Sequence, residues 1–170
     1  MKLFSTCLFL SCFVFLSGCG SLPQGKVYGW KTATTHKNRS PETSNIHSVR
    51  TSMAGDTDSI TFVFSEGRIP GYHIDFSDAP YRKRNAIEPL KVKGNAWMFI
   101  KFSPAKMHTE DGGATIASAE RHLNYPNLKE AEAVFEENDQ VAWVLGLDRR
   151  TEYRVKELKN PARIVVEIKR

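Results

Sequence analysis

Apolar and polar residues alternate with a period of two along most of the chain after residue 45, which is the pattern of half-buried β-strands. In the stretch 59–64, for example, Ile60, Phe62 and Phe64 share one face. Similar patterns predict further strands over residues 71–77, 96–102, 141–147, 151–158 and 162–169. Several short strands separated by polar turns predict an all-β fold, either an antiparallel β-sandwich or a barrel.

Two segments depart from simple alternation. Residues 141–147 are nearly all apolar, which predicts a central strand covered on both faces. Residues 125–137 have the Ala and Glu content of a helix, but their apolar positions fit neither period. We expect a strand beginning near Ala131, and one short helix remains the alternative.

The first 18 residues are typical of a bacterial secretory leader. Lys2 supplies the positive start, and residues 3–16 form an apolar stretch that is too short to cross a bilayer comfortably. The next run, Leu16-Ser17-Gly18-Cys19, resembles a lipobox, at which the leader is removed and the cysteine thiol receives a lipid. We therefore predict a signal peptide over 1–18 and lipidation of Cys19, with fatty acyl chains such as palmitate. An ordinary leader with an incidental cysteine is the alternative.

The predicted lipid anchor indicates where in the cell the protein is located. Two or more acyl chains hold a protein stably on a membrane. Gly20 follows the cysteine, and by resemblance to bacterial sorting signals the absence of Asp there favours the outer membrane. We expect a cell-envelope lipoprotein that faces the periplasm if the organism has an outer membrane, and otherwise lies on the outer face of the cell membrane.

Residues 19–44 have no sustained period and are rich in Gly, Ser, Thr and Pro, so they are predicted to be a flexible tether. Tyr28 and Trp30 are the exceptions in this polar stretch. They are expected to dock on the membrane or on the domain, or to be two aromatic residues in a flexible segment. The remaining residues, 45–170, are enough for one domain with its own core.

The net charge of the chain indicates which class of partner it can bind. The chain has 24 Lys and Arg against 19 Asp and Glu, and loss of Lys2 with the leader leaves 23 minus 19, or +4. A mild positive balance outside the cytoplasm points to anionic lipid or wall polymers. Nucleic acid is not an expected partner, because the leader takes the protein away from it. We expect no cofactor and no metal.

The C-terminal end carries a more specific pattern. Its residues are Arg154, Val155, Leu158, Pro161, Arg163 and the run 164–167. Further short motifs are Gly-Leu-Asp-Arg-Arg at 146–150, Pro-Gly-Tyr at 70–72 after Phe62 and Phe64, Pro-Ala-Lys-Met-His at 104–108 and Tyr-Pro at 125–126. Together they resemble the AMIN and AMIN-like domains of bacterial envelope proteins over about residues 46–170.

This resemblance implies a β-sandwich that binds or targets and is not itself an enzyme. In N-acetylmuramoyl-L-alanine amidases and secretin subunits, the AMIN domain directs its owner to peptidoglycan or to the division site. For this chain the resemblance implies a non-catalytic module, with peptidoglycan or another envelope polymer as the expected ligand.

A group of cations near the signature is the candidate ligand-binding face. Arg154 and Arg163 stand on neighbouring predicted strands, and arginine suits carboxylates and phosphates through its bidentate geometry. The candidate residues are Arg149, Arg150, Arg154, Lys156 and Arg163, with Lys159 beside them. The alternative is that the arginines are structural partners of Glu152 or Glu167 across the strands.

Two rival functions remain. One is an adaptor that binds another envelope protein through an exposed sheet edge. The other is a hydrolase or metal-dependent enzyme, which requires the side chains of His108, Glu110, Asp111 and His122 to converge in one pocket. His73 and Asp75 share a strand face, but no activated nucleophile accompanies them, so a solvated surface is expected there.

Overall fold

The computed structural model describes residues 24–39, 42–81 and 88–170. The predicted leader and Cys19 lie outside the described residues, so lipidation stays a prediction. The strands are β1 Gly25–Val27, β2 Thr35–Lys37, β3 Ser44–Ala54, β4 Thr57–Phe64, β5 Gly71–Ser77, β6 Ala96–Ser103, β7 Ala105–Lys106, β8 Glu120–His122, β9 Leu128–Glu137, β10 Gln140–Leu147, β11 Tyr153–Leu158 and β12 Arg163–Lys169.

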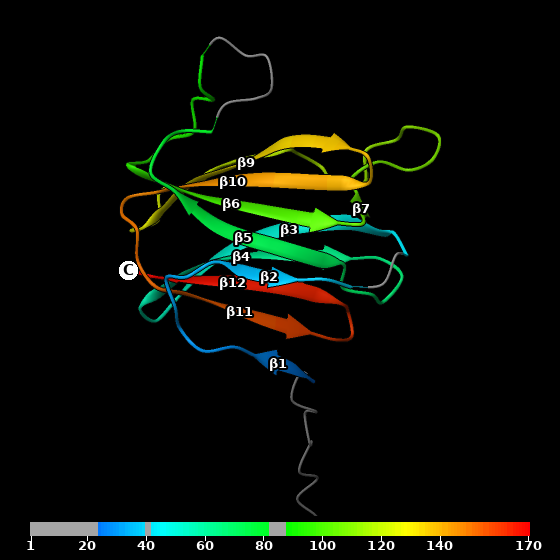
Figure 1. Ribbon diagram of the computed structural model, residues 1–170, viewed down its shortest axis with the longest axis horizontal. Coiled ribbons are helices and arrows are strands. Elements are labelled where there is room, and N and C mark those ends of the chain that lie inside the picture. The colour runs from blue at the N-terminus through cyan, green and yellow to red at the C-terminus, as the bar shows by residue number, and fades with distance from the viewer. Residues whose placement is uncertain (1–23, 40–41, 82–87) are drawn as a thin grey trace, which may run out of the picture.

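The strands form two six-stranded sheets packed face to face (Figure 1). The first sheet has the order β1-β11-β12-β4-β3-β7, and the second has the order β2-β5-β6-β10-β9-β8. All pairs are antiparallel except β3 with β7. The predicted all-β sandwich is confirmed, and the short helix proposed as an alternative is absent from the described residues, where 128–137 is a strand. These residues also contain no helix that is long and apolar enough to cross a membrane.

Large rings join the two sheets at the centre of the core. Phe62 of β4 is fully buried, and its ring lies edge-on to Phe102 of β6 and Trp143 of β10, with centroids 4.8 and 5.5 Å away. Inward residues of the alternating strands complete this core. The face that the sequence pattern assigns to the interior is therefore the face that meets the other sheet.

The outer face of β10 is covered as well. Ala142 and Val144 point away from the main core and are still buried, in a second cluster with Val92 and Val134. Half-buried Trp97 packs on this cluster, and its indole N–H donates to the carbonyl of Val92. The prediction of a central strand covered on both faces is confirmed.

The predicted flexible tether is wrong for residues 24–39. Residues 25–27 form β1 along β11, and residues 35–37 form β2 along β5. The Tyr28 ring packs against the core, and the Trp30 ring lies under the cations of Arg154 and Lys169, at 4.4 and 5.0 Å. Both aromatic residues therefore dock on the domain. These strands lie at sheet edges and are held by backbone hydrogen bonds, so they need no apolar alternation.

Candidate functional site

Three of the five predicted cations do share one face. The register of β11 with β12 places Arg154, Lys156 and Arg163 on the outer face of the first sheet. However, Arg154 is ion-paired with Glu167, and the Lys156 ammonium donates to the same carboxylate at 2.5 Å. This is the structural alternative expected from the sequence. Both cations are therefore held by this one carboxylate, and the three groups together carry one net positive charge.

Arg149 and Arg150 lie in the loop before β11 and not on the sheet. The Arg149 guanidinium is 3.9 Å from Asp148, and that of Arg150 is 3.5 Å from Asp78 and 4.8 Å from the Phe76 ring centre. Both arginines are thus beside acids. Ligand binding by the five residues stays a prediction, but they do not form one continuous uncompensated surface.

Arg163 is the exception, because it faces a shallow groove across β4. The groove also contains Arg50 of β3, together with the hydroxyl side chains of Ser52 and Thr61. Within the described part of the chain, neither guanidinium has an acidic partner within 4 Å. Of the predicted set, Arg163 is therefore the residue best placed to meet an anion.

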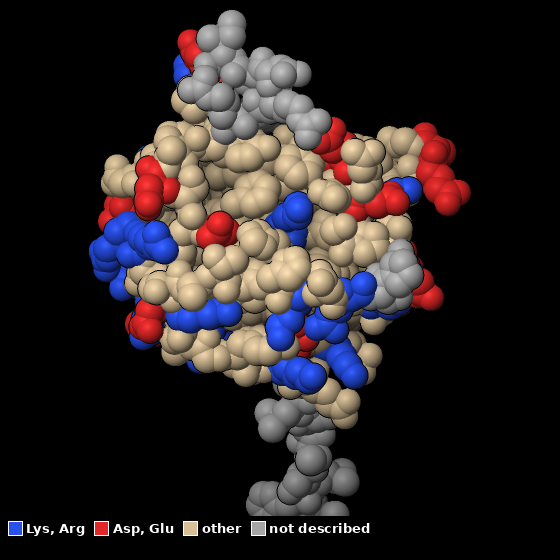
Figure 2. Space-filling view, viewed as in Figure 1, with Lys and Arg blue, Asp and Glu red and all other residues tan. Residues whose placement is uncertain are grey.

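A larger concentration of basic side chains lies on the second sheet. It forms a groove of about 350 Å³ where β2, the start of β5 and the end of β6 meet, and we call it the basic groove. Its lining residues are His36, Lys37, Asn38, Arg39, Gly71, Tyr72, His73, Lys101, Ser103 and Pro104. None of these is acidic. Figure 2 shows the Lys and Arg side chains gathered over β1, β2 and the nearby end of β11.

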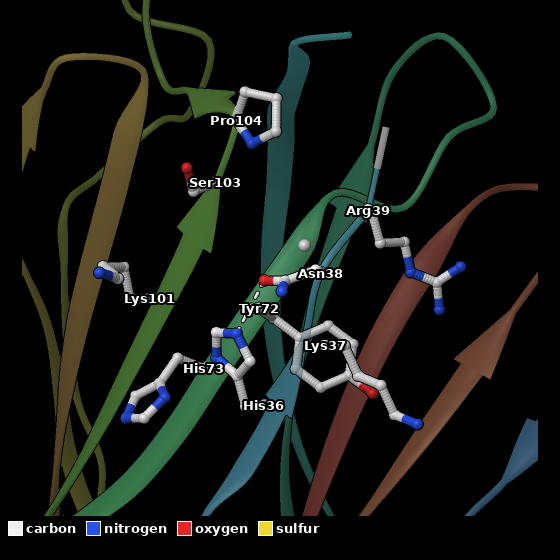
Figure 3. A pocket seen from close by; sticks show the side chains of 10 residues that line it. His36, Lys37, Asn38, Arg39, Tyr72, His73, Lys101, Ser103 and Pro104 are labelled. Carbon is white, nitrogen blue, oxygen red and sulfur yellow. Dashed lines mark hydrogen bonds between the residues drawn. The ribbon is translucent and has the colours of Figure 1, made fainter. Parts of the chain in front are cut away.

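The side chains that line the basic groove come from both faces of the second sheet at its β2 edge (Figure 3). On one side, Lys101 lies near the imidazoles of His36 and His73, whose ring centres are 5.7 Å apart. His36 Nε2 is 2.7 Å from Asn38 Oδ1. Lys37 lies on the opposite face of β2, with its Nζ 4.9 Å from the centre of the Tyr28 ring, and Arg39 reaches Glu157 of the first sheet. The groove therefore runs around the edge strand β2 and offers ammonium, amide and hydroxyl donors, which carboxylates and phosphates accept.

Gly71 permits the close approach of the strands under the groove. A Cβ at this position would lie 2.6 Å from the Ser103 carbonyl oxygen and 2.9 Å from that of Lys37. Any larger residue would push β2 or β6 away. The close packing of β5 against its two neighbouring strands therefore requires the glycine of the Pro-Gly-Tyr motif.

A buried carboxylate next to the groove holds two of its lining residues. Glu157 of β11 is 6% exposed, and its Oε1 accepts the Tyr72 hydroxyl at 2.8 Å and the Arg39 guanidinium at 2.6 Å. Burial raises the pKa of Glu157, but the hydrogen bonds from Arg39 and Tyr72 outweigh it, so the pKa lies below its usual range. Burial and the same carboxylate raise the pKa of Tyr72 well above that of a free tyrosine. Glu157 thus joins the two sheets and holds Arg39 in place.

We expect Glu157→Gln to lower the free energy of unfolding by about 2–3 kcal/mol at neutral pH, less than for a fully buried pair because Arg39 is one third exposed. Since the folded pKa is depressed, the stabilisation is present above the unfolded pKa of about 4.3 and is lost as the pH falls through the folded value. Urea denaturation of both proteins at several pH values measures this. A difference in unfolding free energy between the two proteins that stays constant down to acidic pH would contradict this prediction.

The histidines of the enzyme hypothesis do not converge. His108 is paired with Glu136, and His122 lies 2.8 Å from Glu130. These two glutamates are near opposite ends of β9, about 20 Å apart along an extended strand. Within the described residues, no group of three or more His, Cys, Asp or Glu side chains is placed to hold a metal ion. The arrangement therefore lacks the single pocket that this hypothesis requires.

The sequence analysis does not predict the basic groove, because it places residues 36–39 in the tether. The signal was present in the run His36-Lys37-Asn38-Arg39, which has three basic residue types in four positions. Without the pairing of β2 to β5, nothing indicated that this run would meet His73 and Lys101.

Comparisons with known proteins identify the family. The family model of the AMIN-like domain matches residues 44–170, which is nearly the whole described sandwich. No curated protein matches the chain, and no solved structure matches it either. A match over three quarters of the chain is decisive, and the chain belongs to the AMIN-like domain family.

Proposed function

We propose that this chain is a lipid-anchored cell-envelope protein whose AMIN-like domain binds an anionic envelope polymer, with peptidoglycan as the preferred ligand, and does not act as an enzyme. The membrane is reached through lipidated Cys19, and the polymer is bound through the basic groove. The AMIN-like family is consistent with a binding or targeting module in the envelope.

The observation that carries this proposal is that, among the described residues, Lys37 and Lys101 of the groove have no acidic partner within 4 Å, whereas Arg39 is paired with Glu157 and His73 lies 4.0 Å from Asp75. Of the five predicted cations, four sit beside carboxylates, and Arg163 is the exception. In the groove, the described lining contains cations, imidazoles and neutral donors. Its neighbour Glu157 is already neutralised by Arg39. Uncompensated charge attracts and holds anions, whereas compensated charge does little.

The ligand chemistry follows from the donors. Peptidoglycan presents carboxylates on its peptide stems and amides and hydroxyls along the chain. Lys37 and Lys101 suit the carboxylates, while Asn38 and Ser103 suit neutral groups. Exposed charges act weakly alone, so we expect modest affinity that depends on many stems bound at once.

The sheet edges favour side-chain binding over β-augmentation. The outermost strands are β1 and β7 in the first sheet and β2 and β8 in the second, and each is only two or three residues long. Such short edges offer few free backbone groups to an added strand. An adaptor role through a sheet edge is therefore the weaker alternative.

Removing two groove charges tests the proposal. We expect Lys37→Ser with Lys101→Ser to weaken binding to purified peptidoglycan about tenfold, since each exposed charge contact contributes up to about 1 kcal/mol. The matched control is Arg149→Ser with Arg150→Ser, which removes the same charge from a loop where both arginines already neighbour acids. Co-sedimentation measures both. Equal losses in the two variants would show non-specific attraction, and a larger loss in the control would favour the predicted face.

A further inference from the structure

The N-terminal segment runs along one edge of the sandwich and is firmly joined to it. β1 pairs with the end of β11, and the amide of Lys159 donates to the carbonyl of Gln24 at 2.9 Å. Further along, Lys31 and Tyr153 exchange two backbone hydrogen bonds of 2.8 and 2.9 Å. Residues 24–31 therefore form the margin of the first sheet, which we call the β1 edge.

This geometry leaves a very short connection to the proposed anchor. Only residues 20–23 separate Cys19 from Gln24. Five residue steps span at most about 18 Å even when fully extended. A domain of this size has a radius of gyration of about 14 Å, so the connection is about as long as the domain's own radius. Lipidation at Cys19 would hold the β1 edge near the membrane and keep the opposite side away.

The charges of the β1 edge suit an anionic surface. Lys26 and Lys159 are exposed, Lys31 is half-buried, and residues 24–31 contain no acid. Glu157, the acid beside them, is paired with Arg39. Val27 is 59% exposed and pairs with Lys156 in the register of β1 with β11. Exposed lysines on an edge that is held close to a membrane are attracted to anionic headgroups, and an exposed apolar side chain beside them can enter the interface.

We propose that the β1 edge docks on an anionic phospholipid surface, with Lys26 and Lys159 against the headgroups and Val27 at the interface. The inference rests on the lipidation of Cys19 proposed above. Docking fixes the orientation of the domain and leaves the outer face of β5 and β6, where His73 and Lys101 of the basic groove lie, open to the polymer.

A single fluorescent label reports this orientation. Cys19 is the only cysteine after the leader, and its thiol carries the lipid, so a new cysteine is unique. Val27→Cys places the label on the β1 edge, and Glu110→Cys places a control label on the loop between β7 and β8, at the far end of the molecule (Figure 1). The full lipidated chain is reconstituted into vesicles of phosphatidylglycerol and phosphatidylethanolamine that contain a headgroup quencher, and into vesicles of phosphatidylcholine alone with the same quencher.

We expect strong quenching at Val27→Cys on the anionic vesicles, weak quenching there on phosphatidylcholine, and little at Glu110→Cys on either. Adding Lys26→Ser and Lys159→Ser should reduce the ratio of docked to undocked domain about 30-fold, because each lysine near an anionic surface contributes about fivefold. Equal quenching of the two labels on vesicle-bound protein would overturn docking while leaving the anchor intact. A chain that does not remain with the vesicles would refute the anchor and the inference together.

Discussion

Phe62→Ala is expected to lower the free energy of unfolding by about 3–5 kcal/mol, the typical result of truncating a buried aromatic ring. Phe62 is fully buried between the sheets, and its ring contacts those of Phe102 and Trp143 edge-on. Its loss removes both the transfer free energy and the edge-on ring contacts, and leaves a cavity. Urea denaturation measures the change.

The matched control is Val27→Ala, which truncates an exposed apolar side chain. We expect a change of no more than about 0.5 kcal/mol. A loss below about 1.5 kcal/mol for Phe62→Ala would mean that the core closes over the gap, and that the two sheets are not joined mainly at this ring.

Asp58→Ala is expected to have an effect of similar size, about 3–5 kcal/mol, because it removes one partner of a buried ion pair. The Asp58 side chain is fully buried. Its Oδ2 accepts the amides of Asn127 and Leu128 at 2.7 and 2.9 Å, and its Oδ1 accepts Arg170 Nε at 2.8 Å. One carboxylate thus joins β4, the start of β9 and the C-terminal residue, and its loss leaves three donors unpaired.

Asp56→Ala provides the comparison for this site. Asp56 is two positions away, exposed at the turn between β3 and β4, so we expect a change within about 0.5 kcal/mol. Arg170→Ala should lie between the two, since the Arg170 side chain is 28% exposed and the two amides keep their acceptor. Equal stability of Asp58→Ala and Asp56→Ala in urea would refute the structural role of Asp58.

Strands whose alternation is regular could be predicted from the sequence, and those with bulges could not. The predictions over 59–64 and 71–77 correspond to β4 and β5. β4 pairs with β12 without a register shift, and β5 pairs with β6 without one. In β3 the register shifts between Ile46 and Ser48, so the buried residues Ile46 and Val49 stand three positions apart. A bulge of this kind breaks the period of two.

The same cause explains the ambiguity of residues 125–137. The pairing of β9 with β10 shifts twice, opposite Ala142 and Trp143 and again opposite Gly146 and Leu147. Each shift exchanges the faces, so Leu128 and Ala131 reach the main core while Val134 reaches the outer cluster. The strand starts at Leu128, three positions before the predicted start at Ala131. The register shift opposite Gly146 and Leu147 breaks the alternation there, so the first residues of the strand do not show a period of two.

The candidate site was harder to predict than the fold, because it depends on which charges are compensated. The predicted cations Arg154 and Lys156 stand in the expected place, but sequence spacing alone did not decide between ligand binding and pairing with Glu167. Conversely, His36 and Lys101 are 65 positions apart and come together only through β2, β5 and β6. Whether a surface cation has an acidic partner depends on which strands become neighbours in the fold, so it cannot be determined from sequence spacing alone.

The most direct test of the central claim is co-sedimentation of the wild-type protein with two preparations of purified peptidoglycan, one native and one with its carboxylates converted to amides. We predict binding to native peptidoglycan that weakens as added salt shortens the Debye length below about 8 Å, and little binding to the amidated form. Protein that stays in the supernatant with native peptidoglycan, even at low salt, would contradict the claim. Equal binding to both preparations would contradict a basic groove that acts through carboxylates.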